Sequence, residues 1–201
     1  MDQKTEESRT AYDKIASEYD TSREGQYTRF HIKELSDTID LRKNDIVLDV
    51  ACGNGTLLRE LSKRAKIQAY GIDVSKNMIH AAKVRYPNMD FQVKPCYPLE
   101  WGDESVDIIT VCCAFHHFVN PQGFANECKR VLKKSGAVYL ADPNFGAVLR
   151  FFANNLWFPF SKSGDVRVYG PKELETFFYN AEFNTVQVYR KDQGLFLKAK
   201  K

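Results

Sequence analysis

The chain has 201 residues, of which 43% are hydrophobic and 27% charged, with a formal net charge of +3. This length and composition fit one ordinary globular domain, and so small a charge gives no reason to expect a nucleic-acid partner. The polar, acidic start is no signal peptide, and no apolar run reaches transmembrane length. The five cysteines lack Cys-x-x-Cys spacing, so we expect no disulfide framework or zinc site, reduced thiols and a cytoplasmic location.

Two helices are predicted before the first strand. Apolar residues recur at helical spacing over residues 8–20 and again from Tyr27 to Ile39. These helices would form an N-terminal cap over the sheet that follows.

Strands and helices then alternate, and a hairpin at Asp192-Gln193-Gly194 closes the chain. Asn120-Pro121 should start one helix, which we expect to end at Lys133-Lys134-Ser135-Gly136, and Pro171 should open the last one. The pattern predicts an α/β fold with helices on both faces of the sheet. The predicted strands cover residues 46–50, 68–73, 89–93, 106–113, 137–141, 185–189 and 195–199.

The chain is organised around the apolar strand Ile46–Val50 and the small-residue turn that follows it. A strand, such a turn and a helix predict a nucleotide-type site, because small residues let a ligand approach the backbone closely. A P-loop is excluded since no Lys follows Gly55, and Leu58 stands where a dinucleotide fingerprint needs Gly or Ala. What remains is a two-residue spacing of Asp49, Ala51, Gly53 and Gly55, for which an empty turn is the plain alternative.

This spacing resembles the first motif of the class I S-adenosylmethionine-dependent methyltransferases. The resemblance covers nearly the whole chain and implies a Rossmann-like, doubly wound, seven-stranded sheet, mostly parallel, with an antiparallel C-terminal hairpin. It also implies S-adenosyl-L-methionine as cofactor and S-adenosyl-L-homocysteine as product. Ala51 stands where the family more often has Gly, and we expect it to fit with φ below zero. Within one domain we expect a helical cap (1–42), a cofactor-binding core (43–142), a substrate lid insertion (143–170) and a C-terminal helix and hairpin (171–201).

The resemblance also assigns residues to the cofactor. Asp73 ends the second predicted strand, where a carboxylate can accept both ribose hydroxyls. Lys94-Pro95-Cys96 stands where the family usually has Gly-Asp-Ala, so Pro95 lacks the carboxylate for the adenine amino group and should weaken the grip. Tyr19, preferred over Tyr12, would close over the cofactor and offer its ring to the sulfonium; a core aromatic is the alternative. The implied cofactor-binding residues are Tyr19, Asp49, Ala51, Cys52, Gly53, Gly55, Asp73, Val74, Met78, Pro95, Cys96, Tyr97, Cys112 and Cys113.

His116 and His117 follow the fourth predicted strand and are the candidate catalytic residues. A histidine can act as general base near neutral pH, and a structural histidine is the alternative. The pair lacks a third ligand at suitable spacing, so we expect no metal. Cys112 and Cys113, as neighbours in a strand, should point to opposite faces. Asp142-Pro143-Asn144-Phe145 resembles the Asp-Pro-Pro-Tyr motif of nucleic-acid amino methyltransferases but follows the wrong strand, so it is assigned no role.

The connection from Asn144 to Tyr169 is long for an αβ loop, so we expect it to have structure of its own. It is crowded with aromatic residues, and a helix apolar around so much of its circumference should bury more than one face. It would pack on the sheet and roof the acceptor site. A dimer contact or plain core is the alternative.

The resemblance implies a small-molecule methyltransferase with a small, apolar or aromatic acceptor and with no nucleic-acid or membrane partner. A homodimer is left open. Two alternatives stand beside it. One is a non-catalytic protein that binds S-adenosylmethionine or S-adenosylhomocysteine on the same fold, which Pro95 favours. The other is an NAD-dependent oxidoreductase, which Leu58 disfavours.

Overall fold

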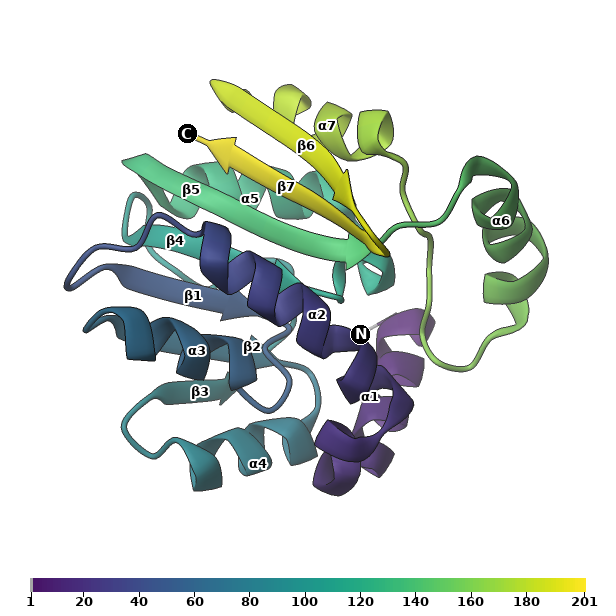
Figure 1. Cartoon of the computed structure of the whole chain (residues 1–201), viewed down its shortest axis with the longest axis horizontal. Coiled ribbons are helices and arrows are strands. Elements are labelled where there is room, and N and C mark those ends of the chain that lie inside the picture. The colour runs from purple at the N-terminus through teal and green to yellow at the C-terminus, as the bar shows by residue number, and fades with distance from the viewer. Residues whose placement is uncertain (1) are drawn as a thin grey trace.

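The structure, a computed structural model, describes residues 2–201, which form a single seven-stranded sheet (Figure 1). The strand order is β3-β2-β1-β4-β5-β7-β6, and neighbouring strands are parallel except at β7, which is antiparallel to both β5 and β6. The predicted mostly parallel sheet with its antiparallel hairpin is therefore confirmed. The strands are β1 (Ile46–Val50), β2 (Gln68–Asp73), β3 (Asp90–Val93), β4 (Val106–Cys112), β5 (Leu132–Pro143), β6 (Thr185–Lys191) and β7 (Gly194–Lys200).

Helices flank the sheet on both sides (Figure 1). Within residues 2–201, no helix is both long enough and apolar enough to cross a membrane. The α-helices are α1 (Gln3–Ile15), α2 (Arg23–Thr38), α3 (Thr56–Arg64), α4 (Lys76–Arg85), α5 (Pro121–Val131), α6 (Ala147–Phe152) and α7 (Pro171–Asn180). The other helical turns are η1 (Ala16–Thr21), η2 (Phe115–His117), η3 (Ala153–Trp157) and η4 (Phe158–Phe160).

Each face of the sheet has its own hydrophobic core. Val47 packs with residues of α2 and α3 on one face, whereas its neighbour Leu48 packs with residues of α5 and α7 on the other. Successive side chains of a strand point to opposite faces, so a strand covered on both sides is mostly apolar at successive positions. This explains why every residue of β1 except Asp49 is apolar.

The N-terminal helices begin earlier than predicted. Asp2 caps α1 by accepting a hydrogen bond from Thr5 N, so the helix starts at Gln3 rather than at residue 8. Ser22 caps α2 in the same way, accepting from Gly25 N. Between them the predicted helical turn at Tyr19 is the 3₁₀ turn η1.

The predicted end of α5 at Lys133–Gly136 is wrong. The helix ends at Val131, and Leu132, buried with extended backbone, already belongs to β5. Lys133 then pairs with Asp107 at 2.7 Å, which ties the start of β5 to β4. Core packing of Leu132 therefore outweighs the helix-end signal of the basic residues.

The long connection after β5 has structure of its own, as predicted, in α6, η3 and η4. It projects from the body of the fold (Figure 1). The expectation that its helical part buries more than one face is wrong, because within α6, η3 and η4 only Ala153 and Phe158 are buried, in a small cluster with Val168. Most of its large apolar side chains face outward.

Candidate active site

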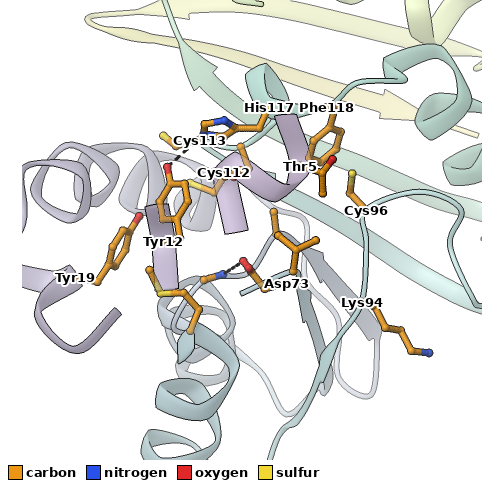
Figure 2. A pocket seen from close by; sticks show the side chains of 16 residues that line it. Thr5, Tyr12, Tyr19, Asp73, Lys94, Cys96, Cys112, Cys113, His117 and Phe118 are labelled. Carbon is orange, nitrogen blue, oxygen red and sulfur yellow. Dashed lines mark hydrogen bonds between the residues drawn. The ribbon is translucent and has the colours of Figure 1, made fainter. Parts of the chain in front are cut away.

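A cavity opens at the carboxyl ends of β1, β2 and β4 and is covered by α1 (Figure 2). We call it the strand-end cavity. In open α/β sheets this edge is where ligands bind. Its lining residues are Thr5, Ser8, Tyr12, Tyr19, Ala51, Gly53, Asp73, Val74, Met78, Lys94, Cys96, Cys112, Cys113, Ala114, His117 and Phe118.

Five of the residues predicted to bind the cofactor lie outside this lining. Asp49 and Cys52 are buried beneath the turn. Gly55 caps the start of α3 with a φ of 80°. A Cβ at this position would lie 2.7 Å from the Phe91 ring on β3, so glycine is needed here for close packing of α3 against β3. Pro95 and Tyr97 line a neighbouring groove, together with Cys96. Pro95, the position at which this chain departs from the family's usual Asp, therefore lies outside the cavity wall.

The turn after β1 reverses direction through left-handed backbone. Ala51, Gly53 and Gly55 have φ values of 57°, 52° and 80°. The expectation that Ala51 adopts a negative φ is thus wrong. The tight turn, in which Cys52 N donates to Ile72 O at 2.9 Å, imposes the conformation in spite of the methyl group. A Cβ on Gly53 would meet no atom within 4 Å, so its backbone faces open space.

Ala51→Gly is expected to raise the free energy of unfolding by about 1 kcal/mol, because glycine adopts a left-handed φ without steric cost. For a domain of this size the melting temperature should rise by about 2–4 °C. Ala65→Gly, at a φ of −151°, is the matched control and should lower it. An equal fall of the melting temperature in both variants would contradict the presence of backbone strain at Ala51.

Asp73 stands at the floor of the strand-end cavity. Its carboxylate accepts hydrogen bonds from Gly53 N at 2.9 Å and from Ser75 N at 2.8 Å. Burial raises its pKa to about 6, although these bonds oppose the shift. Each oxygen keeps a free lone pair, so the carboxylate can accept two further donors such as ribose hydroxyls. Val74 and Met78 form the apolar wall beside it.

Asp49 is buried beneath the turn that follows β1 and links β1 to β4. Its Oδ1 accepts a 2.6 Å hydrogen bond from Thr110 Oγ1 on β4. Burial raises its pKa to about 7, with Thr110 opposing and Asp73 reinforcing the shift. This carboxyl group therefore holds a structural proton over much of the acidic range.

Asp49→Asn is expected to stabilise the fold increasingly as pH rises. The pKa is raised from 3.8 to about 7 in the folded state, so this group's stabilising contribution declines between those values, because the unfolded chain loses a proton that the folded chain keeps. The variant stays neutral, and its advantage should grow by at most about 1.4 kcal/mol per pH unit. Denaturant melts from pH 4 to pH 8 measure this difference. Exposed Asp90→Asn is the control, and a pH-independent difference at Asp49 would contradict the assignment.

The N-terminal segment covers the cavity and is fixed in place. Tyr12 OH lies 3.3 Å from His117 Nε2, and Tyr19 OH lies 3.2 Å from Thr28 Oγ1. Asp13 joins α1 to α4 by accepting a 2.6 Å hydrogen bond from Ser75 Oγ. Burial raises the pKa of both tyrosines, so both rings are neutral. Tyr12, the second choice from the sequence, thus lines the cavity together with Tyr19.

Cys112 and Cys113 both line the cavity, so the expectation that they point to opposite faces is wrong. β4 ends at Cys112, and Cys113 takes a φ of 51°, which breaks the strand alternation. Burial raises the pKa of the Cys113 thiol, which disfavours the reactive thiolate.

Two histidines and two carboxylates meet at one side of the cavity. His116 Nδ1 lies 2.8 Å from Asp142 Oδ1. Burial alone would lower the pKa of His116, but the charge and hydrogen bond of Asp142 outweigh it, and the pKa is raised above 6.5. Burial and the neighbouring His116 lower the pKa of His117, which is therefore neutral. His116 is therefore the more basic of the two histidines and is oriented by Asp142, whereas His117 is neutral and contacts Tyr12.

The expectation that no third potential ligand lies near the two histidines is wrong. Asp165 Oδ1 lies 3.8 Å from His116 Nε2 and 3.9 Å from His117 Nδ1. It is held there because the backbone N–H groups of Val166 and Arg167 donate to His116 O. Ligand atoms of a tetrahedral zinc site lie roughly 3.4 Å apart, so the present spacing is wider than zinc requires.

A second cavity adjoins the first, and we call it the aromatic cavity. Tyr27, Phe145, Trp157 and Phe158 form much of its wall, and His116 and Asp165 form part of its polar side. Tyr12, Cys113 and His117 line both cavities. The two compartments therefore meet at these three residues, next to the His116–Asp142 pair.

Several lining residues were missed from the sequence. Thr5 and Ser8 lie at helical spacing before Tyr12, and this signal was available once Asp2 is read as the helix cap. Lys94, Ala114 and Phe118 flank predicted positions without a signal of their own. Asp142 and Asp165 reach the site only through folding.

Comparison with known proteins agrees with this geometry. A family model described as methyltransferase domain matches residues 48–140. The chain is 30% identical over 172 residues to the demethylmenaquinone methyltransferase of Thermotoga maritima, covering 79% of this chain and 75% of that protein. It is 27% identical to the ubiquinone/menaquinone biosynthesis C-methyltransferase UbiE of Campylobacter jejuni, covering 71% and 68%.

Among solved structures, phosphoethanolamine N-methyltransferase 2 of Haemonchus contortus, in complex with S-adenosyl-L-methionine, superposes with a TM-score of 0.75. Sequence identity is 14%, and the match covers 94% of this chain and 57% of that chain. At this identity the likeness concerns the fold alone.

Proposed function

The chain belongs to the class I S-adenosylmethionine-dependent methyltransferases, and on this premise we propose that it methylates a ring carbon of a small aromatic acceptor of the hydroquinone type. The observation that carries the proposal is the junction of the two cavities at Tyr12, Cys113 and His117. A methyl donor in one compartment and an acceptor in the other would meet there. The names of the two related enzymes, which concern quinones, support the acceptor class.

The strand-end cavity suits the cofactor, which when bound supplies a methyl group on a sulfonium. Asp73 would hold the ribose through its two free acceptor positions. Val74, Met78 and Cys96 would enclose the adenine, and the open backbone at Gly53 would allow close approach. The half-buried rings of Tyr12 and Tyr19 would face the cation. Pro95, outside the wall, would leave this grip in place.

The aromatic cavity suits a flat apolar acceptor. Tyr27, Phe145, Trp157 and Phe158 offer ring faces and edges, which stack favourably on another ring. The segment 143–170 would serve as the lid of this compartment. Its polar side at His116 and Asp165 would take the acceptor hydroxyl.

His116 would act as the general base. Asp142 occupies Nδ1 and stabilises the charged imidazolium, which leaves Nε2 to remove a proton from an acceptor hydroxyl. The resulting phenolate shifts electron density to the adjacent ring carbon, which bonds to the methyl group as sulfur takes the electron pair. Loss of that carbon's own proton would then restore the aromatic ring as a phenolate, which would take back the first proton from His116, so one proton is released in net. His117, neutral and bonded to Tyr12, would position the acceptor.

Initial rates with a labelled methyl donor test this proposal. A reduced naphthoquinone should be methylated, whereas the oxidised quinone, which has no hydroxyl to deprotonate, should not. Amine and thiol acceptors of similar size should react far more slowly. Turnover of amines alone would contradict the proposal, and binding of S-adenosylhomocysteine without any turnover would favour a non-catalytic binding protein.

A further inference from the structure

An apolar surface outside the site runs along the segment that projects after β5 (Figure 1). We call it the α6 face. Its members are large apolar side chains between 50% and 81% exposed. They are Val148, Leu149, Phe151, Phe152, Leu156, Trp157 and Phe160. Isolated exposed apolar residues are ordinary, but a cluster this dense in so short a stretch indicates an interaction surface.

A basic groove adjoins the α6 face and shares Phe151 with it. Arg150, Arg167, Lys172 and Arg190 line the groove, with Glu173 as its acidic member. Glu173 pairs with Arg167 at 2.8 Å and lies 3.8 Å from Arg150. Lys172 and Arg190 form no ion pair with any residue of 2–201. The groove therefore carries excess positive charge.

The segment itself repeats this pattern in sequence. Residues 143–164 contain two basic residues, Arg150 and Lys162, and neither Asp nor Glu. Aromatic and aliphatic side chains beside cationic ones are typical of helices that lie in the boundary of a lipid bilayer, where rings enter the headgroup region and cations meet lipid phosphates. A water-facing segment would be expected to carry acidic residues as well.

We propose that the α6 face and the basic groove dock this protein on the surface of an anionic lipid bilayer. Charge favours this occupant over a second copy of the chain. A symmetric dimer through the α6 face would bring two basic grooves together, whereas anionic headgroups neutralise them. Such contact is peripheral and requires no membrane-spanning helix.

The location has a consequence for access to the site. Trp157 belongs to the α6 face and also lines the aromatic cavity. A bilayer at this face would lie directly outside that cavity, so an apolar molecule dissolved in the lipid could enter without crossing water. The docking surface itself does not rest on the identity of the acceptor.

Sedimentation with vesicles tests the proposal. The protein should pellet with phosphatidylcholine vesicles that contain phosphatidylglycerol and stay in solution with phosphatidylcholine alone. Leu149→Ser with Phe160→Ser, and separately Lys172→Glu with Arg190→Glu, should each lower the partition coefficient at least about tenfold. Val84→Ser and Lys83→Glu, both exposed on α4, are the matched controls and should change little. Added salt should weaken binding.

Tryptophan emission separates insertion from simple charge attraction. In a Trp101→Phe background, the remaining Trp157 should shift its emission to the blue when anionic vesicles are added. Binding that survives the Leu149→Ser, Phe160→Ser pair, with no emission shift, would overturn the proposal in favour of a plain anion site. Absence of vesicle binding, with a dimer in solution that the same pair dissociates, would overturn it in favour of self-association.

Discussion

Replacing His116 with alanine is expected to lower kcat for the hydroquinone by about 10²- to 10⁴-fold, because the acceptor hydroxyl then loses its general base. The dissociation constant of S-adenosylhomocysteine should stay unchanged, since His116 does not line the strand-end cavity. His80→Ala, exposed on α4, is the matched control and should retain full activity. Single-turnover rates and calorimetric binding give the two readouts.

The pH profile distinguishes a base from a merely structural histidine. The base must be unprotonated, so the rate should fall as pH drops through the His116 pKa, which Asp142 holds above 6.5. In Asp142→Asn the opposing effect of burial remains, so the acidic limb should move to lower pH and kcat should fall. An unchanged profile in Asp142→Asn would contradict the His116–Asp142 assignment.

Asp73→Ala is expected to weaken S-adenosylhomocysteine binding by about 1–3 kcal/mol, because two ribose hydroxyls lose a charged acceptor. Asp73→Asn should lose less, since its carbonyl oxygen still accepts one of them. Isothermal titration measures both. In both variants the cofactor would lose only a contact to its ribose, away from the transferred methyl group. The value of kcat at saturating cofactor should therefore change much less than the dissociation constant.

The control for this pair is Asp90→Ala, which removes an exposed carboxylate at the opposite end of the neighbouring strand. It should bind S-adenosylhomocysteine as the unaltered protein does. Asp73 also accepts from Gly53 N and Ser75 N, so thermal melts must show that the variants remain folded. A folded Asp73→Ala with an unchanged dissociation constant would refute the placement of the ribose.

The fold was predictable because local and global signals agree along most of the chain. Burial on both faces makes β1 apolar at successive positions, and this pattern survives in sequence. The hairpin at Asp192 and Gly194 likewise follows from local turn chemistry. Where the prediction failed, at the end of α5, a single buried leucine decided the boundary.

The residues of the candidate site were predictable only where they follow one another in a single stretch of the sequence. The spacing of Ala51 and Gly53 placed the turn correctly, although the left-handed φ of Ala51 could not be read from residue type. Asp142 and Asp165 lie 26 and 49 positions after His116 and reach it through β5 and the loop before α7. Only the register of β4 with β5 and the hydrogen bonds to His116 O bring them together.

The position of the transferred methyl group tests the central claim most directly. The protein would be incubated with S-adenosylmethionine carrying a trideuterated methyl group and with a reduced naphthoquinone, and the product analysed by mass spectrometry and NMR. We expect an intact trideuteromethyl group on a ring carbon, adjacent to a hydroxyl-bearing carbon, and little product with His116→Ala. A label found on oxygen, or an equal yield with His116→Ala, would contradict it.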